Sequence, residues 1–317
     1  MPPENRKLSL LKRLNEELKG SLESCAICPR KCGVDRTRGE LGWCRAGFKP
    51  KVYSYSPHHG EEPPLSGTRG SGTIFFSHCN MKCVYCQNYY FSQLDKGLEI
   101  TIDRLSKIML NLQKQGCHNI NLVTPTHFAP QIFLALEIAI ALGLDIPIVY
   151  NTSGYELPEM IKRLRGIVDI YLPDMRYSDD KIASLYSGAV RYVEYNRNSV
   201  KEMQAKVGDL ILDDDGIAKK GLIIRLLAMP ERLSGTIESL KFIKDDISKN
   251  ARLSIMNQYY PAFKAYDYKE ISRGVTIDEY KFVVDEAKEL GLNNGWVQET
   301  PRGFDSQFLG TNINPNV

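Results

Sequence analysis

The pattern of apolar and polar positions changes near residue 71 of this 317-residue chain. From there, short apolar runs alternate with longer segments whose apolar residues recur every three or four positions. Such alternation of strands and amphipathic helices is typical of a parallel α/β sheet. The pattern predicts six strands, over residues 73–76, 119–123, 147–150, 167–172, 222–228 and 253–257. It predicts helices between them, over residues 102–115, 130–142, 157–164, 179–186, 193–207 and 236–247.

The segments on either side of these units have a different character. We expect residues 1–70 to form an N-terminal helix and a cysteine-rich metal-binding cap. Residues 71–265 form the β/α body, and residues 266–317 a C-terminal helix followed by a polar tail from Gly291. Six units are too few for a closed eight-stranded barrel, which leaves an open partial barrel or a flavodoxin-like sheet.

Composition and charge narrow the class of protein. With 41 Lys and Arg against 38 Asp and Glu, the net charge is only +3, which gives no argument for a nucleic-acid or membrane partner. The most apolar helical run, residues 132–144, is short for a membrane span and is interrupted by Glu137. Seven of the eight cysteines fall into two metal-type sets, and the N-terminus lacks the apolar core of a signal peptide. We therefore expect a cytoplasmic protein.

Three cysteines follow the first predicted strand. Cys79, Cys83 and Cys86 have the spacing C-x3-C-x2-C on the loop that leaves this strand. Three thiolates can each bind one iron of a [4Fe-4S] cluster, and no fourth cysteine lies near enough in sequence to complete the set. The alternatives are a zinc knuckle or buried thiols, but structural zinc normally takes four ligands. The spacing predicts a cluster with one open iron.

A second cysteine set lies in the predicted cap. Cys25, Cys28, Cys32 and Cys44 have the spacing C-x2-C-x3-C-x11-C in a segment with little apolar core of its own. Four thiols in this setting predict a closed metal site, with free or disulfide-linked cysteines as the alternative, and both a structural zinc and an auxiliary iron-sulfur cluster fit. Zinc is slightly favoured, because the first set already supplies redox chemistry. Only about thirty residues join Cys44 to the first strand, so the cap is expected to lie near the barrel mouth.

Polar residues stand at the carboxyl ends of the predicted strands, where ligands of parallel barrels bind. Purely structural roles are open to them as well: a helix cap, an ordinary turn, a surface pair of Asp174 with Arg176, or a structural pair of Arg225 with Asp169. The candidate residues are Thr124, Pro125, Thr126, His127, Asn151, Ser153, Asp174, Arg225 and Asn257.

The cysteine loop, the strand before it and the aromatic Tyr85 resemble the radical S-adenosylmethionine (SAM) superfamily. A longer resemblance covers about residues 25 to 300 and points to the proteins similar to pyruvate formate-lyase activating enzyme. It is carried by the segments Cys-Pro-Arg-Lys-Cys-Gly-Val-Asp-Arg (28–36), Gly-Glu-Leu-Gly-Trp-Cys (39–44), Gly-Ser-Gly-Thr-Ile-Phe-Phe (70–76) and Asn-Leu-Val-Thr-Pro-Thr-His (121–127).

The resemblance implies an α/β fold with an open (β/α)6 partial TIM barrel of the radical SAM type. It implies that a [4Fe-4S] cluster on Cys79, Cys83 and Cys86 binds and cleaves SAM to methionine and a 5'-deoxyadenosyl radical. It further implies a low-potential electron donor of the flavodoxin or ferredoxin type, a cell with little oxygen, and SAM contacts from Tyr85 and the strand-end residues named above.

Three departures from activating enzymes leave the substrate open. His78 stands where activating enzymes have Gly, Thr124 to His127 replace their Gly-Gly-Glu segment, and only fifteen residues separate Cys86 from Ile102. A protein substrate, such as a glycyl radical enzyme, is the first hypothesis. A small-molecule substrate is the second, and a non-catalytic iron-sulfur redox protein is the third.

Overall fold

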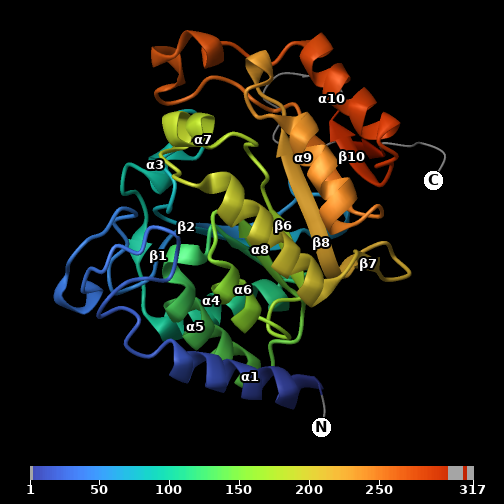
Figure 1. Ribbon diagram of the computed structural model, residues 1–317. Helices are drawn as coiled ribbons and strands as arrows, with labels where there is room; N and C mark the ends of the chain where they lie inside the picture. The colour runs from blue at the N-terminus through green and yellow to red at the C-terminus, as the bar shows by residue number, and fades with distance from the viewer. Residues whose placement is uncertain (1–2, 299–309, 313–317) are drawn as a thin grey trace.

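The computed structural model describes residues 3–298 and 310–312 (Figure 1). At its centre, seven neighbouring strands run parallel to one another. In spatial order they are β2 (Ser71–Phe76), β4 (Ile120–Val123), β5 (Ile148–Thr152), β6 (Ile170–Pro173), β8 (Ala218–Leu227), β9 (Arg252–Met256) and β10 (Gly295–Gln298).

The sheet continues beyond this parallel part on both sides. Antiparallel β1 (Lys51–His58) pairs with β2 and is followed at the edge by β3 (Leu98–Glu99). On the far side β11 (Gly310–Asn312) pairs with β10, and β7 (Ile211–Leu212) pairs with β8. The order of strands ends in β3 and β11 and does not close on itself, which is consistent with an open partial barrel.

All six predicted strands are present, and a seventh parallel strand was missed. The expectation of a polar tail from Gly291 is wrong for β10, whose short sequence Gly-Trp-Val-Gln carries too few apolar residues to signal a strand. Its parallel pairing with β9 and the burial of Trp296 show that it belongs to the sheet. The remainder of the predicted tail lies outside the described residues, apart from β11.

The predicted helices are also present, with small differences at their ends. Residues 243–247 continue α9 as a π-type turn rather than as α-helix. The helices of the body are α4 (Ile102–Lys114), α5 (Ala129–Ala141), α6 (Pro158–Arg163), α7 (Asp180–Ser187), α8 (Tyr192–Val207) and α9 (Thr236–Phe242), and the later helix is α10 (Ile277–Glu289). Two four-residue helices, α2 (Pro63–Ser66) and α3 (Tyr89–Ser92), were not predicted.

Two faces of the sheet carry separate apolar clusters. The larger cluster joins the sheet to the helices, and α1 (Pro3–Glu17) adds Leu11 and Leu14, packing against α5 (Figure 1). Alternate strand residues, among them Val149 and Leu172, point the other way and pack around Leu65 of α2. None of the helices in the described residues is long and apolar enough to cross a bilayer.

A third cluster, rich in tyrosine, lies beyond the strand ends and positions the candidate site. It includes Cys83 from the predicted cluster loop and Met229 from the segment after β8. Figure 1 shows α3, α7 and the segment before α10 gathered at the end of the sheet toward which β8 runs. Its buried tyrosines are Tyr85, Tyr155, Tyr177, Tyr186, Tyr192 and Tyr259.

Candidate functional site

The three-cysteine loop leaves β2 and ends at α3. Its backbone is fixed against the last turn of α7, because the amides of Lys82 and Val84 donate to the carbonyls of Ser187 (3.0 Å) and Tyr186 (2.8 Å). Cys83 is buried, whereas Cys79 and Cys86 are partly exposed. The loop therefore offers its thiols from a rigid support at the carboxyl end of the sheet.

Each of the three thiols meets a polar partner. The backbone amide of Met81 donates to Cys79 Sγ at 3.4 Å, and Ser92 Oγ lies 3.2 Å from Cys86 Sγ. Ser187 Oγ donates to Cys83 Sγ at 3.0 Å, and Arg176 Nη1 lies 3.9 Å from the same sulfur. Amide, hydroxyl and guanidinium donors stabilise thiolates rather than neutral thiols.

The donor set fits an iron-sulfur cluster better than one metal ion. Burial raises the pKa of the Cys86 thiol to about 11 and that of Cys79 further, so a bound cation is needed to keep them deprotonated. Within the described residues, no three His, Cys, Asp or Glu side chains converge as they would around one ion. In a cubane each thiolate binds a different iron, so the three sulfurs need not converge on one ion.

His78 adopts a backbone conformation that normally favours glycine. Its φ is 70°, in the left-handed region, which explains why glycine is suited to this position. The imidazole is buried, and its Nε2 lies 3.3 Å from Asp95 Oδ1, while its amide donates to the Phe91 carbonyl at 2.8 Å. Burial, the largest cause, lowers the pKa of His78 to about 4 despite Asp95, so the ring is neutral near pH 7.

Three predicted SAM residues meet in one polar network. Arg225 Nε lies 2.8 Å from Asp174 Oδ1, and Arg225 Nη2 donates to Asn151 Oδ1 at 2.6 Å. Arg176 Nη2 holds the other oxygen of Asp174 at 2.5 Å. Burial alone would raise the pKa of Asp174, but the two guanidiniums outweigh it and lower the pKa. Asp174 and Asn151 are buried and the two arginines are only partly exposed, so the alternative of an exposed surface pair is wrong.

Two acidic residues that sequence reasoning missed complete this network. Glu61 and Glu62 precede α2 and are buried, and Glu61 Oε2 lies 3.7 Å from Arg225 Nη1. Burial raises the pKa of Glu62 to about 7, against the attraction of Arg225. Asp169, suggested as a partner of Arg225, instead binds Lys7 at 2.6 Å. The run Glu-Glu-Pro-Pro gave no sign that it enters the interior of the fold.

The side chains of Thr126 and His127 bond to groups outside this network. Thr124 has a φ of 54°, again a conformation that suits glycine, and its amide donates to the Asn151 carbonyl. The hydroxyl of Thr126 donates to Glu156 at 2.5 Å, and His127 Nε2 lies 2.7 Å from the Ser77 carbonyl oxygen. Neither side chain caps α5, whose N-cap is Phe128, so the helix-cap alternative is wrong.

The other predicted SAM residues have different surroundings. The hydroxyl of Ser153 is buried and has no hydrogen-bond partner within the part of the chain that the structure describes. Tyr85 OH lies 2.5 Å from Tyr177 OH, inside the tyrosine-rich cluster. The backbone amide of Asn257 donates to Gln298 of β10 at 2.7 Å. Ser153 thus has a buried hydroxyl available to hydrogen-bond a ligand.

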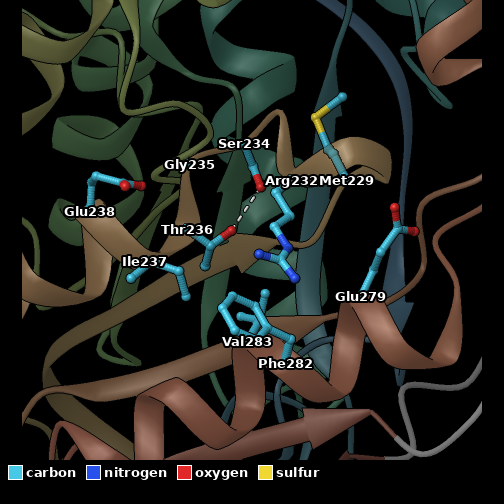
Figure 2. A pocket seen from close by; sticks show the side chains of 10 residues that line it. All are labelled: Met229, Arg232, Ser234, Gly235, Thr236, Ile237, Glu238, Glu279, Phe282 and Val283. Atoms are coloured by element: carbon cyan, nitrogen blue, oxygen red, sulfur yellow. Dashed lines mark hydrogen bonds between the residues drawn. The ribbon is translucent and has the colours of Figure 1, made fainter.

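A separate cavity of about 290 Å³ lies between the segment after β8 and helix α10 (Figure 2). The guanidinium of Arg232 lies over the Phe282 ring at 3.8 Å, and the hydroxyls of Ser234 and Thr236 lie 2.7 Å apart. Met229 lines this cavity and also packs in the tyrosine-rich cluster with Cys83. None of the predicted SAM residues lines it.

The cysteine-rich cap lies against the three-cysteine loop. Arg30 Nε donates to the Asn80 carbonyl at 2.9 Å, one residue from Cys79. The Trp43 ring lies between Arg30 (4.0 Å) and Lys82 of the loop (4.4 Å). Both contacts place the second cysteine set beside the first, as the short connection in sequence predicted.

Comparison with known proteins agrees with this geometry. Residues 73–203 match the family model described as the radical SAM superfamily. The chain is 32% identical over 300 residues to the uncharacterized protein MJ0674 of Methanocaldococcus jannaschii, covering 90% of this chain and 81% of that protein. The chain therefore belongs to the radical SAM superfamily. Within it, the chain shares a family with MJ0674, whose name assigns no activity.

Two solved structures are similar at low identity. One is HydG, a maturase of the [FeFe]-hydrogenase, with a TM-score of 0.47 and 12% identity over 71% of this chain. The other is methylornithine synthase (PylB), with a TM-score of 0.46 and 13% identity over 71% of this chain. The chain spans 50% of the length of the HydG structure and 63% of that of PylB.

Membership in the superfamily implies a radical SAM enzyme that uses a [4Fe-4S] cluster and SAM. The thiols and donors of the three-cysteine loop fit the cluster, and the Ser153 hydroxyl, without a partner among the described residues, fits a polar ligand beyond the end of β5. The activating-enzyme-like branch and the second metal were predicted from sequence, and both remain predictions.

Proposed function

We propose that this radical SAM enzyme abstracts a hydrogen atom from a protein substrate, either to activate a glycyl radical enzyme or to modify another protein. The observation that carries the proposal is the supported loop of Cys79, Cys83 and Cys86, which leaves the fourth cluster position to another molecule. When bound together, the cluster and SAM supply a 5'-deoxyadenosyl radical through transfer of one electron. We expect that electron to come from a flavodoxin- or ferredoxin-type protein.

The residues near the loop have distinct proposed roles. Ser187 and Arg176 stabilise the charge on Cys83, while Ser153 and Asn151 hydrogen-bond SAM. Arg225 keeps Asn151 in place and, through Asp174, is itself held rigidly. The buried tyrosines around Cys83 limit access of water to the reacting atoms.

The predicted contacts of the remaining residues with SAM stay open to test. Thr126 and His127 have other partners, which favours a supporting role in which they fix the segment after β4. Pro125 lies in the same segment. Thr124 can contact SAM through its backbone carbonyl. Tyr85 supports Cys83 through Tyr177 and Ser187. Asn257 lies at the end of β9, beside β10.

A protein substrate is favoured by an exposed aromatic face beside the cluster loop. The face consists of Tyr89, Tyr90, Tyr260 and Phe263. The rings of Tyr89 and Tyr90 stack at 4.4 Å, and those of Tyr89 and Phe263 at 4.9 Å. Tyr90 is 55% exposed and Tyr260 43% exposed. These exposed and partly exposed aromatic residues, which begin three positions after Cys86, are suited to a protein contact.

A small-molecule substrate is the second candidate, and the cavity at Arg232 supports it. Its volume of about 290 Å³ suits a small polar molecule, and Arg232, Ser234 and Thr236 supply polar groups. Met229 joins this cavity to the cluster that surrounds Cys83.

The test begins with reduced, cluster-loaded protein and SAM under anaerobic conditions. Extract from deuterium-labelled cells is separated into a protein fraction and a small-molecule fraction, and each is added in turn. We expect deuterium to enter 5'-deoxyadenosine only with the protein fraction. Transfer only from the small molecules would support the second candidate, and no SAM cleavage at all would contradict a radical enzyme.

Two variants make this test sharper. Tyr90→Ala should reduce deuterium transfer from the protein fraction, because it removes an exposed ring of the aromatic face. Arg232→Ala should leave that transfer unchanged, and would reduce transfer from small molecules under the alternative. SAM cleavage without substrate should be the same in both variants, since neither residue lies among the groups that contact the three thiols.

A further inference from the structure

Two opposite charges line the cavity between the segment after β8 and α10. The wall of this cavity, which has a volume of about 290 Å³, includes Arg232 and Glu238. Within the described residues neither side chain forms an ion pair, with the other or with a third residue. Figure 2 shows the two side chains apart, with Thr236 between them in this view. A cavity with an unpaired cation and an unpaired anion favours a ligand that carries both charges.

The other carboxylate in the cavity wall, that of Glu279, is already paired. Arg273 Nη1 and Nη2 each lie 2.8 Å from one oxygen of Glu279, and these hydrogen bonds lower the pKa of Glu279 to about 2. Arg273 Nη2 also lies 2.7 Å from Glu231, which is not part of the wall. The charges that remain for a ligand are therefore those of Arg232 and Glu238.

The backbone holds Arg232 in position. Glu231 and Arg232 have φ values of 54° and 56°, a left-handed conformation that is strained for residues other than glycine and is found at ligand clamps. Glu279 fixes this turn, because its carboxylate accepts the Glu231 amide at 2.8 Å. The Arg232 guanidinium lies over the Phe282 ring at 3.8 Å, which leaves its in-plane N–H groups available to bind a carboxylate.

Two buried hydroxyls add a hydrogen-bond donor to the same wall. Ser234 and Thr236 are 2% and 4% exposed, and their hydroxyl oxygens lie 2.7 Å apart. One of the two hydrogens forms this bond, so the other can be donated to a ligand. The turn between them is closely packed, since a side chain at Gly235 would collide with Ser178, whose amide donates to the Ser234 carbonyl at 3.2 Å. A ligand would therefore meet a preformed site.

The remainder of the cavity wall is apolar. It consists of Met229, Ile237, Phe282 and Val283, of which Met229 and Val283 are buried. Aliphatic and thioether groups pack well against an aromatic ring and a methionine. The volume lies near the lower end of the range for ligand pockets, so the cavity suits a small molecule with one apolar group.

We propose that this cavity binds a free α-amino acid with an apolar side chain. The α-carboxylate pairs with Arg232 and accepts a hydrogen bond from Ser234 or Thr236, while the α-ammonium pairs with Glu238. The side chain packs in the apolar part of the cavity. The site is separate from the SAM site, because none of the predicted SAM residues lines it. The proposal concerns binding alone, whether the amino acid is a substrate or an effector, and does not depend on the proposed function.

Calorimetric titration of the cluster-loaded protein with L-methionine tests the site. We expect one molecule to bind per chain, with a dissociation constant of about 1 mM or lower. The methyl ester of L-methionine lacks the carboxylate and N-acetyl-L-methionine lacks the ammonium, so each should bind at least about tenfold more weakly. No saturable binding, or equal binding of the three compounds, would overturn the proposal.

Matched variants show whether binding occurs in this cavity. Arg232→Gln and Glu238→Gln each remove one charge from an exposed residue, and each should weaken L-methionine binding at least about tenfold. Arg13→Gln and Glu159→Gln, at exposed residues outside the cavity, should bind like wild type. Wild-type affinity in both cavity variants, or displacement of L-methionine by SAM, would overturn the proposal. SAM cleavage does not enter these measurements, so a failure of the proposed function would leave their result unchanged.

Discussion

The two cysteine sets lie side by side but depend on the fold in different ways. The thiols of Cys79, Cys83 and Cys86 take part of their polar surroundings from remote elements, including Ser187 at the end of α7 and Arg176 after β6. The cap thiols take theirs from the cap itself, chiefly from Arg36 and the amides of Trp43 and Ala46. The first site is assembled by tertiary structure, whereas the second is specified locally.

This difference predicts how each site responds to change. The three-cysteine loop should respond to substitutions far away in sequence, because residues about a hundred positions later contact its sulfur. The cap should respond mainly to substitutions within its own segment. Arg30, Arg36 and His127 form the seam between the two sites. A substitution in one site should have little effect on the other, unless it moves the backbone carbonyls that accept hydrogen bonds from the seam residues.

The largest expected effect separates the two sets directly. Cys83→Ala should abolish SAM cleavage and remove about four irons, because two of the three thiols cannot retain a cubane with an open iron. Cys117→Ala is the matched control and should cleave SAM at the wild-type rate. Iron analysis measures the cluster content of each variant, and quantification of 5'-deoxyadenosine measures its SAM cleavage. Wild-type cleavage by Cys83→Ala would remove the loop from the active site.

The next effect concerns the carboxyl of Glu156, which is fully buried and accepts hydrogen bonds from Thr126 and Thr152. Burial raises its pKa to about 7, although hydrogen bonds from Thr126 and Thr152 oppose the increase. The folded state then binds the proton more tightly than the unfolded state, so stability falls as pH rises from about 4.5 to about 7. The full loss is roughly 3 kcal/mol.

Glu156→Gln should remove the share of this pH dependence that comes from Glu156, leaving that of Glu62, and should be more stable than wild type near pH 8. Thermal denaturation of cluster-loaded protein at about pH 5.5 and about pH 8 tests the difference, and the exposed Glu159→Gln serves as control. An equal loss of stability with pH in wild type and Glu156→Gln would show that another group is responsible.

A smaller effect tests the strand-end residues. Ser153→Ala removes a buried hydroxyl that has no partner in the described residues, so the variant should fold as stably as wild type. If this hydroxyl binds SAM, affinity should fall about tenfold, corresponding to about 1.4 kcal/mol. Equilibrium binding of SAM to the oxidised protein measures it. Unchanged affinity would exclude Ser153 from the SAM site.

Asn151 and Arg225 are less direct probes of the same site. Asn151→Ala should also weaken SAM binding by roughly tenfold, but it removes an acceptor from Arg225. Arg225→Ala leaves Asp174 and Glu61 without their shared cation, so it should destabilise the fold as well. A loss of affinity in these variants is therefore informative only alongside a measurement of stability.

The smallest expected effect comes from a substitution that tests whether the three-cysteine loop depends on remote residues. Ser187→Ala removes the hydrogen bond to Cys83 Sγ and should lower the reduction potential of the first cluster by roughly 40 mV, because the reduced cluster carries more negative charge. Ser106→Ala, a buried serine in α4, should leave the potential unchanged. An anaerobic titration followed by EPR provides the measurement, and equal potentials in all three proteins would contradict the assigned role.

The sequence predicted the parallel strands and both cysteine sets because each depends on local spacing. It did not predict β10, whose four residues become a strand only by pairing with β9. Nor did it predict Glu61 and Glu62, since charged residues before a Pro-Pro turn ordinarily lie at the surface. Their position follows from Arg225, which needs buried acids that only the assembled fold can bring to it.

The same distinction applies to residues that depart from the activating-enzyme pattern. His78 and Thr124 both have positive φ values, a backbone conformation suited to glycine, although neither residue is glycine. The sequence shows that these positions differ from the activating-enzyme pattern. It does not show that His78 contacts Asp95 or that Thr126 contacts Glu156. Such contacts join residues from separate loops.

The position of Trp43 makes the junction between cap and barrel observable by optical spectroscopy. The chain has only two tryptophans, and Trp296 lies in β10. Trp43 is 37% exposed and contacts both Arg30 of the cap and Lys82 of the loop. A Trp296→Phe variant would therefore report on this junction through a single fluorophore, whose emission colour and decay time should change whenever the cap separates from the loop.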